Sequence, residues 1–383
     1  MTTSEVGYRV DVDALAPLDV TSRIPALRAT LEREELDALL VTRLPNVRYL
    51  TGFTGSAAML LVAARDSVFV TDGRYGEQSH EQLGAAGVDA NIAVRTVASE
   101  QLDTLAHALA DGAVRRLGLE AHGVNWAQQR QYSSRFVEAV ANLDVVPAGT
   151  LVEEQRRVKD DGEIDRIRAA CAIADDAFQS IVSRLGSGIT EREFALALEF
   201  AMRERGASGN SFDPIIASGP NGAKPHARPS SRVIGRNELV VCDFGCIVDG
   251  YCSDMTRTVS VGDPGADARH LYEVVLDAQQ SGRALVREGA ELAAIDAACR
   301  DVITRAGWGE LFSHGTGHGV GIEIHEDPRV ARTASGTVVQ RDVVTVEPGV
   351  YLAGVGGVRI EDTVVVGADG AEALTRTPKD LVL

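Results

Sequence analysis

The chain has 383 residues, 45% of them hydrophobic and 24% charged, which is long enough for more than one domain with its own core. Its formal net charge of −17 at pH 7 argues against binding to nucleic acid or to an anionic membrane, because both partners need clustered Lys and Arg. The composition is that of an ordinary acidic globular protein.

Three features of the sequence bear on where in the cell the protein is located. The first residues, M-T-T-S-E-V-G-Y-R-V-D-V-D, lack the basic segment and apolar core of a signal peptide. The longest apolar run, 57–64, is far shorter than the ~20 residues that a membrane-spanning helix needs. The five cysteines do not have the spacing of the disulfide framework of a secreted protein. They are Cys171, Cys242, Cys246, Cys252 and Cys299. We therefore expect a cytoplasmic protein.

Helical and strand patterns alternate along the N-terminal part of the chain. A helical pattern from residue 23 runs into a strand at 36–42, and the segment 46–56 (N-V-R-Y-L-T-G-F-T-G-S) is predicted to be a turn. Further strands are expected at 59–63, 67–71, 91–96 and 116–120, and helices near 75–84, 100–110 and 127–141. This alternation predicts an α/β domain, which we assign to residues 1–155. Asp72, Arg74 and Tyr75 are interpreted as solvated turn residues at a strand end.

Residues 156–383 are expected to form a second domain. The charged segment 152–163 is interpreted as a linker leading into a helix, because Asp160 and Glu163 form a capping box. A second capping box, Thr190 with Glu193, predicts a helix that ends near Arg205. A strand is predicted at 212–217, and two more helical patterns lie near 265–288 and 291–306.

Two stretches of this second domain repeat one pattern of acids within apolar strands. N-E-L-V-V-C-D-F-G carries Asp243, and R-D-V-V-T-V-E-P-G carries Glu347 at the matching position. Each stretch passes through a turn into another strand, which carries Asp254 in the first copy and Glu361 in the second. We therefore expect two related halves around a mostly antiparallel sheet. The predicted fold class is α+β, with a separate α/β N-terminal domain.

Acids inside apolar strands require a physical explanation. One acidic pair alone would be interpreted as a hairpin whose acids face water, but a repeat at matched positions disfavours that alternative. An unpaired ionised carboxylate in a buried strand costs several kcal/mol. Four carboxylates are the ligand set of a hard divalent cation such as Mn²⁺, or of a pair of cations held ~3.5–4 Å apart by bridging carboxylates. Cys242 and Cys246 are predicted core residues, because strand alternation turns them away from the face of Asp243.

The stretch F-S-H-G-T-G-H-G-V-G-I-E-I-H-E-D-P contains three histidines. His314 and His318 have the spacing of a zinc-binding helix, but Gly315 replaces the glutamate of that motif and the many glycines make a helix improbable. The glycines form only a weak nucleotide-binding pattern, since no strand-then-helix context surrounds them. We interpret the stretch as a backbone that passes close to the metals and presents one imidazole as a ligand. For His314 a purely structural role is an equal alternative.

Four motifs in order resemble a known family. The motifs that resemble it are D-F-G-(x)8-D-M-T-R-T, H-G-T-G-H-G-V-G, E-P-G-V-Y and R-I-E-D-T. This family is the pita-bread metallopeptidases, which include methionine aminopeptidase, prolidase and aminopeptidase P. The resemblance implies a pita-bread fold for the C-terminal domain. It also implies that Asp243 chelates one metal and that Asp254 and Glu361 bridge two. His318 and Glu347 would complete the shell of the second metal.

The resemblance extends to the proline-specific branch of that family. R-Y-L-T-G-F-T-G-S and T-D-G-R-Y resemble the creatinase-like N-terminal domain of this branch, which methionine aminopeptidases lack. The branch also implies functional roles for His226, His325 and Arg359. Creatinase shares the two-domain plan but lacks the full ligand set found in this sequence. The implied substrate is a small peptide with proline at its second position, and the implied assembly is a homodimer.

The implied mechanism is hydrolysis at two divalent metal ions, Mn²⁺ in the first place, with Co²⁺ or Zn²⁺ as alternatives. A water that bridges two such cations loses its proton near neutral pH and becomes the nucleophile. Glu347 is the expected general base, and His226 and His325 are the expected donors to the substrate carbonyl. Two alternatives remain open: a hydrolase of another small amide such as an ectoine-type derivative, and a binding module without catalysis. An intact ligand set argues against the second.

Overall fold

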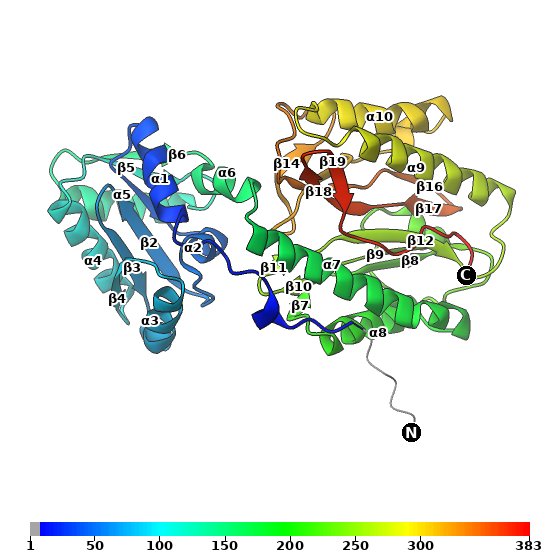
Figure 1. Cartoon of the computed structure of the whole chain (residues 1–383), viewed down its shortest axis with the longest axis horizontal. Helices are drawn as coiled ribbons and strands as arrows, with labels where there is room; N and C mark the ends of the chain where they lie inside the picture. Colours follow the sequence, from blue (N-terminus) through cyan, green and yellow to red (C-terminus); the bar gives the residue numbers. More distant parts are fainter. Residues whose placement is uncertain (1–7) are drawn as a thin grey trace, which may run out of the picture. The chain divides into compact units, whose positions relative to one another are not determined.

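The computed structural model in Figure 1 describes residues 8–383, which fold into two compact units. The smaller unit is Asp19–Arg156, and the larger one combines residues 8–18 with Arg157–Leu383. The sequence had grouped residues 8–18 with the N-terminal domain. In the structure this segment is tied to the larger unit, where the Tyr8 amide donates to Asp176 Oδ2 (3.2 Å) and Arg166 donates to the carbonyl of Ala16 (2.8 Å).

The smaller unit is a mixed six-stranded sheet covered by helices, with strand order β4-β3-β2-β1-β5-β6. Its central strands β1 and β2 pair in antiparallel fashion, whereas β1 with β5 and β5 with β6 pair in parallel. The strands are β1 (Ala38–Val41), β2 (Ala58–Ala63), β3 (Ser67–Thr71), β4 (Asn91–Val94), β5 (Arg116–Glu120) and β6 (Asp144–Ala148). The helices are α1 (Arg23–Arg33), α2 (Leu44–Thr51), α3 (Gly76–Ala85), α4 (Ala98–Asp111), α5 (Trp126–Ala139) and α6 (Leu151–Arg157), the last of which ends at the junction of the units.

Most of these elements agree with the sequence patterns, but the predicted turn at 46–56 is wrong. Its first half belongs to helix α2, which has a proline in its first turn and ends at Gly52 in the left-handed conformation (φ 73°). The carboxylate of Glu120 accepts hydrogen bonds from the amides of Thr42 (2.6 Å) and Arg43 (2.8 Å) and so stabilises the start of this helix. Because that capping group lies on a distant strand, local sequence gave no signal for it.

The three residues interpreted as a solvated turn lie in a turn, in which Arg74 is exposed and Asp72 and Tyr75 are partly buried. Asp72 caps the short 3-10 helix η2 (Gly73–Tyr75) by accepting from the Arg74 amide at 2.9 Å. The Arg74 side chain is 66% exposed and pairs with Asp72 at 2.8 Å.

The larger unit has four long helices in two pairs. They are α7 (Asp161–Ile181), α8 (Glu191–Glu204), α9 (Ala266–Leu285) and α10 (Leu292–Arg305). Both predicted capping boxes are confirmed, at the starts of α7 and α8. One apolar core joins α7 and α8 to the first set of strands, and another joins α9 and α10 to the second set. In Figure 1 the two helix pairs lie on opposite sides of the strands, which gives the layered arrangement of a pita-bread fold.

The strands of this unit pair in antiparallel fashion, as the sequence predicted. The first half contains the sheet β12-β9-β8 and the second half the sheet β14-β13-β15-β18-β19. The strands of these sheets are β8 (Ile215–Ser218), β9 (Leu239–Phe244), β12 (Met255–Ser260), β13 (Gly317–Gly319), β14 (Glu326–Val330), β15 (Val343–Val346), β18 (Asp362–Gly367) and β19 (Gly370–Ala373). Shorter strands form the sheet β11-β10-β7 and the hairpin β16-β17, with bounds β7 (Gly209–Asn210), β10 (Cys246–Val248), β11 (Tyr251–Cys252), β16 (Gly349–Leu352) and β17 (Gly356–Arg359).

The predicted repeat is present, with an offset between its copies. In the first half Thr256 of β12 pairs with Asp243 of β9, whereas in the second half Thr363 of β18 pairs with Thr345 of β15. Glu347 therefore lies just beyond the end of β15, where its amide donates to the carbonyl of Thr316 at 2.7 Å. The halves meet where the amide of Glu361 donates to the carbonyl of Thr256 at 3.1 Å. Along residues 8–383, no helix is both long and apolar enough to cross a membrane.

Candidate metal centre

The five predicted ligands come together inside the larger unit. They are Asp243 on β9, Asp254 before β12, His318 in β13, Glu347 after β15 and Glu361 before β18. Potential ligand atoms of Asp254, His318 and Glu361 all lie within 4.8 Å of one another. His318 Nε2 is also 3.5 Å from Glu347 Oε1 and 3.5 Å from Asp254 Oδ2. Asp243 Oδ2 accepts from Arg359, which also donates to Thr256 Oγ1, and Thr256 in turn donates to Glu361.

The carboxylates in this cluster are strongly destabilised as anions. Burial raises the pKa of Asp254 well above its usual range, and the neighbouring charges of Glu361, Asp243 and Glu347 raise it further. Burial likewise raises the pKa of Glu347 to about 8 and, with Glu347 and Asp243 nearby, raises the pKa of Glu361 well above its usual range. So many acids at close range favour the binding of protons or cations over the free anions.

Two oxygen atoms in the cluster lack a protein partner. Asp243 Oδ1 and Glu361 Oε1 are buried and have no hydrogen-bond partner among residues 8–383. The second oxygen of each group is held: Arg359 donates to Asp243 Oδ2, and Thr256 Oγ1 donates to Glu361 Oε2 at 2.7 Å. Buried acceptors are nearly always satisfied, so two unpartnered oxygens on neighbouring carboxylates fit the donor atoms of a cation site.

The orientation of His318 is that of a metal ligand. Its Nδ1 lies 2.9 Å from the carbonyl of Gly319, so Nδ1 carries the proton and donates. Burial lowers the pKa of His318 to about 4, which leaves the ring neutral and Nε2 unprotonated near neutral pH. The Nε2 lone pair then faces the carboxylates of Asp254 and Glu347, an unfavourable contact unless a cation or a proton lies between them. Metal-binding histidines typically donate their other N–H to a carbonyl in this way.

The donor set therefore fits a divalent metal centre. It comprises four carboxylates and one imidazole, and hard or borderline divalent cations prefer such oxygen-rich ligands. The cysteines take no part: all five are free thiols buried in the protein, and Cys242 and Cys246 belong to the apolar core under α7 and α8, as predicted.

Threonines on the same strands orient the ligands, which the sequence did not reveal. Besides the bond from Thr256 to Glu361, Thr363 Oγ1 donates to the carbonyl of Asp254 at 2.7 Å. The amide of His318 donates to Thr345 Oγ1 at 3.1 Å. The repeated threonine after each second acid was visible in the sequence, but only the strand pairing shows which ligand each one contacts.

Arg359 connects the candidate ligands to a second polar group. Besides Asp243, its guanidinium donates to the hydroxyl of Tyr351 (2.6 Å), to Thr256 Oγ1 (3.1 Å) and to the carbonyl of Pro225 (3.2 Å). Burial alone would lower the pKa of Arg359, but Tyr351 and the carboxylates of Asp243 and Glu347 raise it well above its usual value. The group is thus a permanent buried cation. Tyr351 lies in the E-P-G-V-Y motif, but no role for it was predicted.

His314 has partners on both ring nitrogens. Nδ1 donates to the carbonyl of Gly315 (2.8 Å), and Nε2 accepts from the Tyr351 hydroxyl (2.9 Å), which itself accepts from Arg359. Burial lowers the pKa of His314 to about 4, which keeps the ring neutral and Nε2 an acceptor. Of the two interpretations of this residue, the geometry therefore favours the structural one.

His325 and His226 lie beside the cluster. The His325 ring is in T-shaped contact with that of His318, with ring centroids 4.4 Å apart. Burial, with a contribution from the charge of Arg329, lowers the pKa of His325. His226 is exposed on the loop after β8, where the carbonyl of the preceding Pro225 accepts a hydrogen bond from Arg359 at 3.2 Å. The structure thus brings all the predicted site residues into one region.

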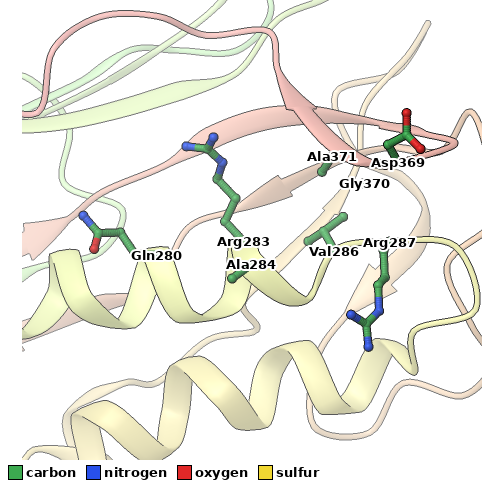
Figure 2. A pocket seen from close by; sticks show the side chains of 8 residues that line it. All are labelled: Gln280, Arg283, Ala284, Val286, Arg287, Asp369, Gly370 and Ala371. Atoms are coloured by element: carbon green, nitrogen blue, oxygen red, sulfur yellow. The ribbon is translucent and has the colours of Figure 1, made fainter.

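A separate hollow of about 450 Å³ lies beside the C-terminal end of α9 and the turn between β18 and β19. Figure 2 shows that its two arginines, Arg283 and Arg287, extend in different directions. The hollow contains no predicted site residue and no convergent set of charges. It is lined by Gln280, Arg283, Ala284, Val286, Arg287, Asp369, Gly370 and Ala371.

The raised pKa values predict that metal binding releases protons. The metal-free cluster holds protons more tightly than ordinary carboxyl groups do, with the pKa of Glu347 raised to about 8, and a cation must displace those protons. Titration calorimetry with Mn²⁺ in two buffers of different ionisation enthalpy should therefore give different apparent enthalpies. Equal enthalpies in the two buffers would contradict the protonated cluster.

The raised pKa values also predict how the stability of the metal-free protein changes with pH. Because the folded metal-free protein holds these protons more tightly than the unfolded chain, its free energy of unfolding should fall as pH rises from about 4, the unfolded carboxyl value, towards the Glu347 pKa of about 8. Metal-loaded protein should not share this decline.

Comparison with known proteins agrees with the site. Residues 165–368 match the model of metallopeptidase family M24, and residues 23–158 match the creatinase/prolidase N-terminal domain. An uncharacterised peptidase of Bacillus subtilis is 38% identical over 94% of this chain and 99% of its own length. A Xaa-Pro dipeptidase of Pyrococcus horikoshii is 33% identical over 92% of this chain and 96% of its own.

Two solved structures share the whole architecture. A Xaa-Pro dipeptidase from Bacillus anthracis superposes with a TM-score of 0.88 at 38% identity and covers 95% of this chain and 100% of its own. An X-Pro aminopeptidase from Thermotoga maritima superposes with a TM-score of 0.82 at 34% identity, covering 92% and 100%. With its cluster of four carboxylates and one imidazole, and with these matches along its length, the chain belongs to metallopeptidase family M24.

Proposed function

We propose that the protein is a metal-dependent Xaa-Pro peptidase, which hydrolyses the bond between an N-terminal residue and a following proline. The observation that carries this proposal is the convergence of Asp243, Asp254, His318, Glu347 and Glu361, with two buried oxygens that lack a partner. The names of the relatives from Pyrococcus horikoshii and Bacillus anthracis support the substrate class.

The five side chains would hold two divalent cations, with Asp254 and Glu361 shared between them. When bound, the metal pair activates a water as nucleophile and polarises the scissile carbonyl. Mn²⁺ is the first choice because the set is rich in oxygen, and Co²⁺ and Zn²⁺ are the alternatives.

Glu347 is the proposed general base. Its side chain is 19% exposed, so a substrate and a water have access to it, and Oε1 faces the His318 imidazole. Its carboxylate takes the proton of the attacking water and passes it to the nitrogen of the leaving proline. This second transfer is essential, because the proline nitrogen in the substrate has no hydrogen and must leave as a protonated amine.

His226 and His325 are the proposed contacts to the substrate carbonyl. An imidazole N–H donated to that oxygen stabilises the negative charge that develops in the tetrahedral intermediate. Arg359 acts one step away: it holds Asp243 through the donated hydrogen bond and so fixes one side of the metal cluster.

Two further proposals concern the protein in the cell. A cytoplasmic location is supported by the composition and by five cysteines that are all free thiols. A homodimer is proposed from the family resemblance, and light scattering coupled to size-exclusion chromatography would test it.

Hydrolysis of a peptide panel tests the substrate class. Metal-loaded protein should cleave Xaa-Pro dipeptides or longer Xaa-Pro-Yaa peptides, and it should leave a Met-Ala peptide intact. The two proline substrates also separate a dipeptidase from an aminopeptidase. Cleavage of the Met-Ala peptide alone would refute the proline specificity, and inactivity towards all three with metal bound would favour another small amide or a binding module.

A further inference from the structure

A buried ion pair connects the start of helix α7 to the turn that carries His325. Lys159 precedes the helix, its side chain is only 1% exposed, and its Nζ lies 3.4 Å from Glu326 Oε2. Glu326 follows His325 directly in the sequence, and its side chain is 6% exposed. A lysine this deeply buried needs a partner of opposite charge, and Glu326 supplies one.

Glu326 also organises the turn itself. Its Oε1 accepts a hydrogen bond from the amide of Glu323 at 2.9 Å, across the turn that ends in His325. The carboxylate lies directly over Gly321, where an added Cβ would meet Glu326 Oε2 at 2.5 Å. One carboxylate thus holds the turn with one oxygen and Lys159 with the other. The imidazole of His325 is presented from this turn against His318.

The backbone on the lysine side is fixed as well. Arg157 makes a two-pronged contact with the buried carboxylate of Asp342, at 2.9 and 2.7 Å. The amide of Lys159 donates to the carbonyl of Arg341 at 3.3 Å, and Arg341 donates to Asp161 Oδ1 at 2.6 Å. Lys159 is therefore anchored independently of the turn, so its ammonium group is a fixed point to which Glu326 is held.

We infer that Lys159 is a positioning residue, whose ion pair with Glu326 places the His325 imidazole beside the metal centre. The inference rests on the proposed function, in which His325 contacts the substrate carbonyl. Without the lysine, Glu326 Oε2 would lose the ammonium group that lies against it, and a space would open where that group lay, so the carboxylate could shift. Such a shift loosens the turn, and a displacement of about 1 Å in a catalytic group lowers the rate by up to ~10²-fold.

The test is a double-mutant cycle in full-length, metal-loaded protein. Lys159→Met should lower kcat for a Xaa-Pro substrate by about tenfold or more, with the metal stoichiometry unchanged. In a His325→Ala background the same substitution should change kcat by less than about twofold, because its effect passes through that imidazole. The inference would be overturned if Lys159→Met lowered kcat by the same factor in both backgrounds. It would also be overturned if Lys159→Met had the wild-type kcat.

Three variants separate positioning from general destabilisation. Lys159→Arg should recover most of kcat, and Glu326→Gln should lower kcat as Lys159→Met does. Arg205→Met removes another largely buried ion pair of the same unit, that of Arg205 Nε with Asp176 Oδ2 (2.6 Å), and should lower Tm with kcat unchanged. A loss of kcat in Arg205→Met equal to that in Lys159→Met would show that the effect is not specific and would overturn the inference.

A structural readout works even without a substrate. Crystal structures of Lys159→Met and Glu326→Gln should show the His325 ring displaced from its contact with His318, and an unmoved ring in both would overturn the inference. If the wild-type protein cleaves no Xaa-Pro peptide, the proposed function fails, and the position of this ring still decides whether Lys159 places His325.

Discussion

Replacing Asp254 with Asn is expected to abolish hydrolysis and metal binding together. The substitution keeps the shape of the side chain but removes the charge at the centre of the cluster, where Asp254 lies beside His318 and Glu361. The expected fall in kcat exceeds the ~10–100-fold that loss of an outer-shell partner costs, because Asp254 would hold the metal directly. Activity and metal content of the purified variant, the latter by elemental analysis, provide the two measurements.

A matched control is available on the surface of the same unit. Asp263 is 68% exposed and pairs with Arg269 at 2.9 Å, so Asp263→Asn makes the same chemical change away from the cluster. It should leave both kcat and metal content at the wild-type level. If Asp254→Asn keeps both activity and its metals, the proposed centre is wrong.

Replacing Arg359 with Lys or Met is expected to have the next largest effect. The guanidinium donates to Asp243, Tyr351, Thr256 and Pro225 at once, and the ammonium of a lysine cannot reproduce this planar fork. Both variants should lose about 10–100-fold in kcat. In the metal-free state Arg359→Met should also lose ~3–5 kcal/mol of unfolding free energy, because Asp243 is left without its buried partner.

Kinetics and denaturant unfolding of the two variants check this expectation. Arg269→Lys, in which the arginine is 42% exposed, is the control for the same substitution at a surface ion pair and should be neutral. A wild-type kcat in Arg359→Lys would show that positive charge alone is sufficient and that the hydrogen-bond geometry is unimportant.

The cluster of candidate metal ligands was predictable because its acids violate a general rule. Acids such as Asp243 and Glu361 within apolar strands have no stable place in a folded core without a counter-charge, so their repetition in the sequence was informative. The antiparallel pairing and the capping boxes of α7 and α8 followed from equally local signals. The predicted and observed ends of the strands coincide where the strand pattern in the sequence ends abruptly, as in β3 and β5.

Features that depend on distant contacts could not be predicted. The start of α2 is capped by Glu120, and the role of Lys159 depends on Glu326. In both cases the two partners lie far apart in the sequence. The offset between the two halves, which places Glu347 past the end of β15, follows from strand register and not from the repeated motif. Likewise, only packing shows that residues 8–18 belong with the larger unit.

Anomalous diffraction from crystals of the Mn²⁺-loaded protein tests most directly whether the five side chains together hold two cations. The expected result is two anomalous peaks, both within the cluster of Asp243, Asp254, His318, Glu347 and Glu361. The absence of any peak in that cluster, or a single peak at full metal saturation, would contradict a two-metal centre in this protein.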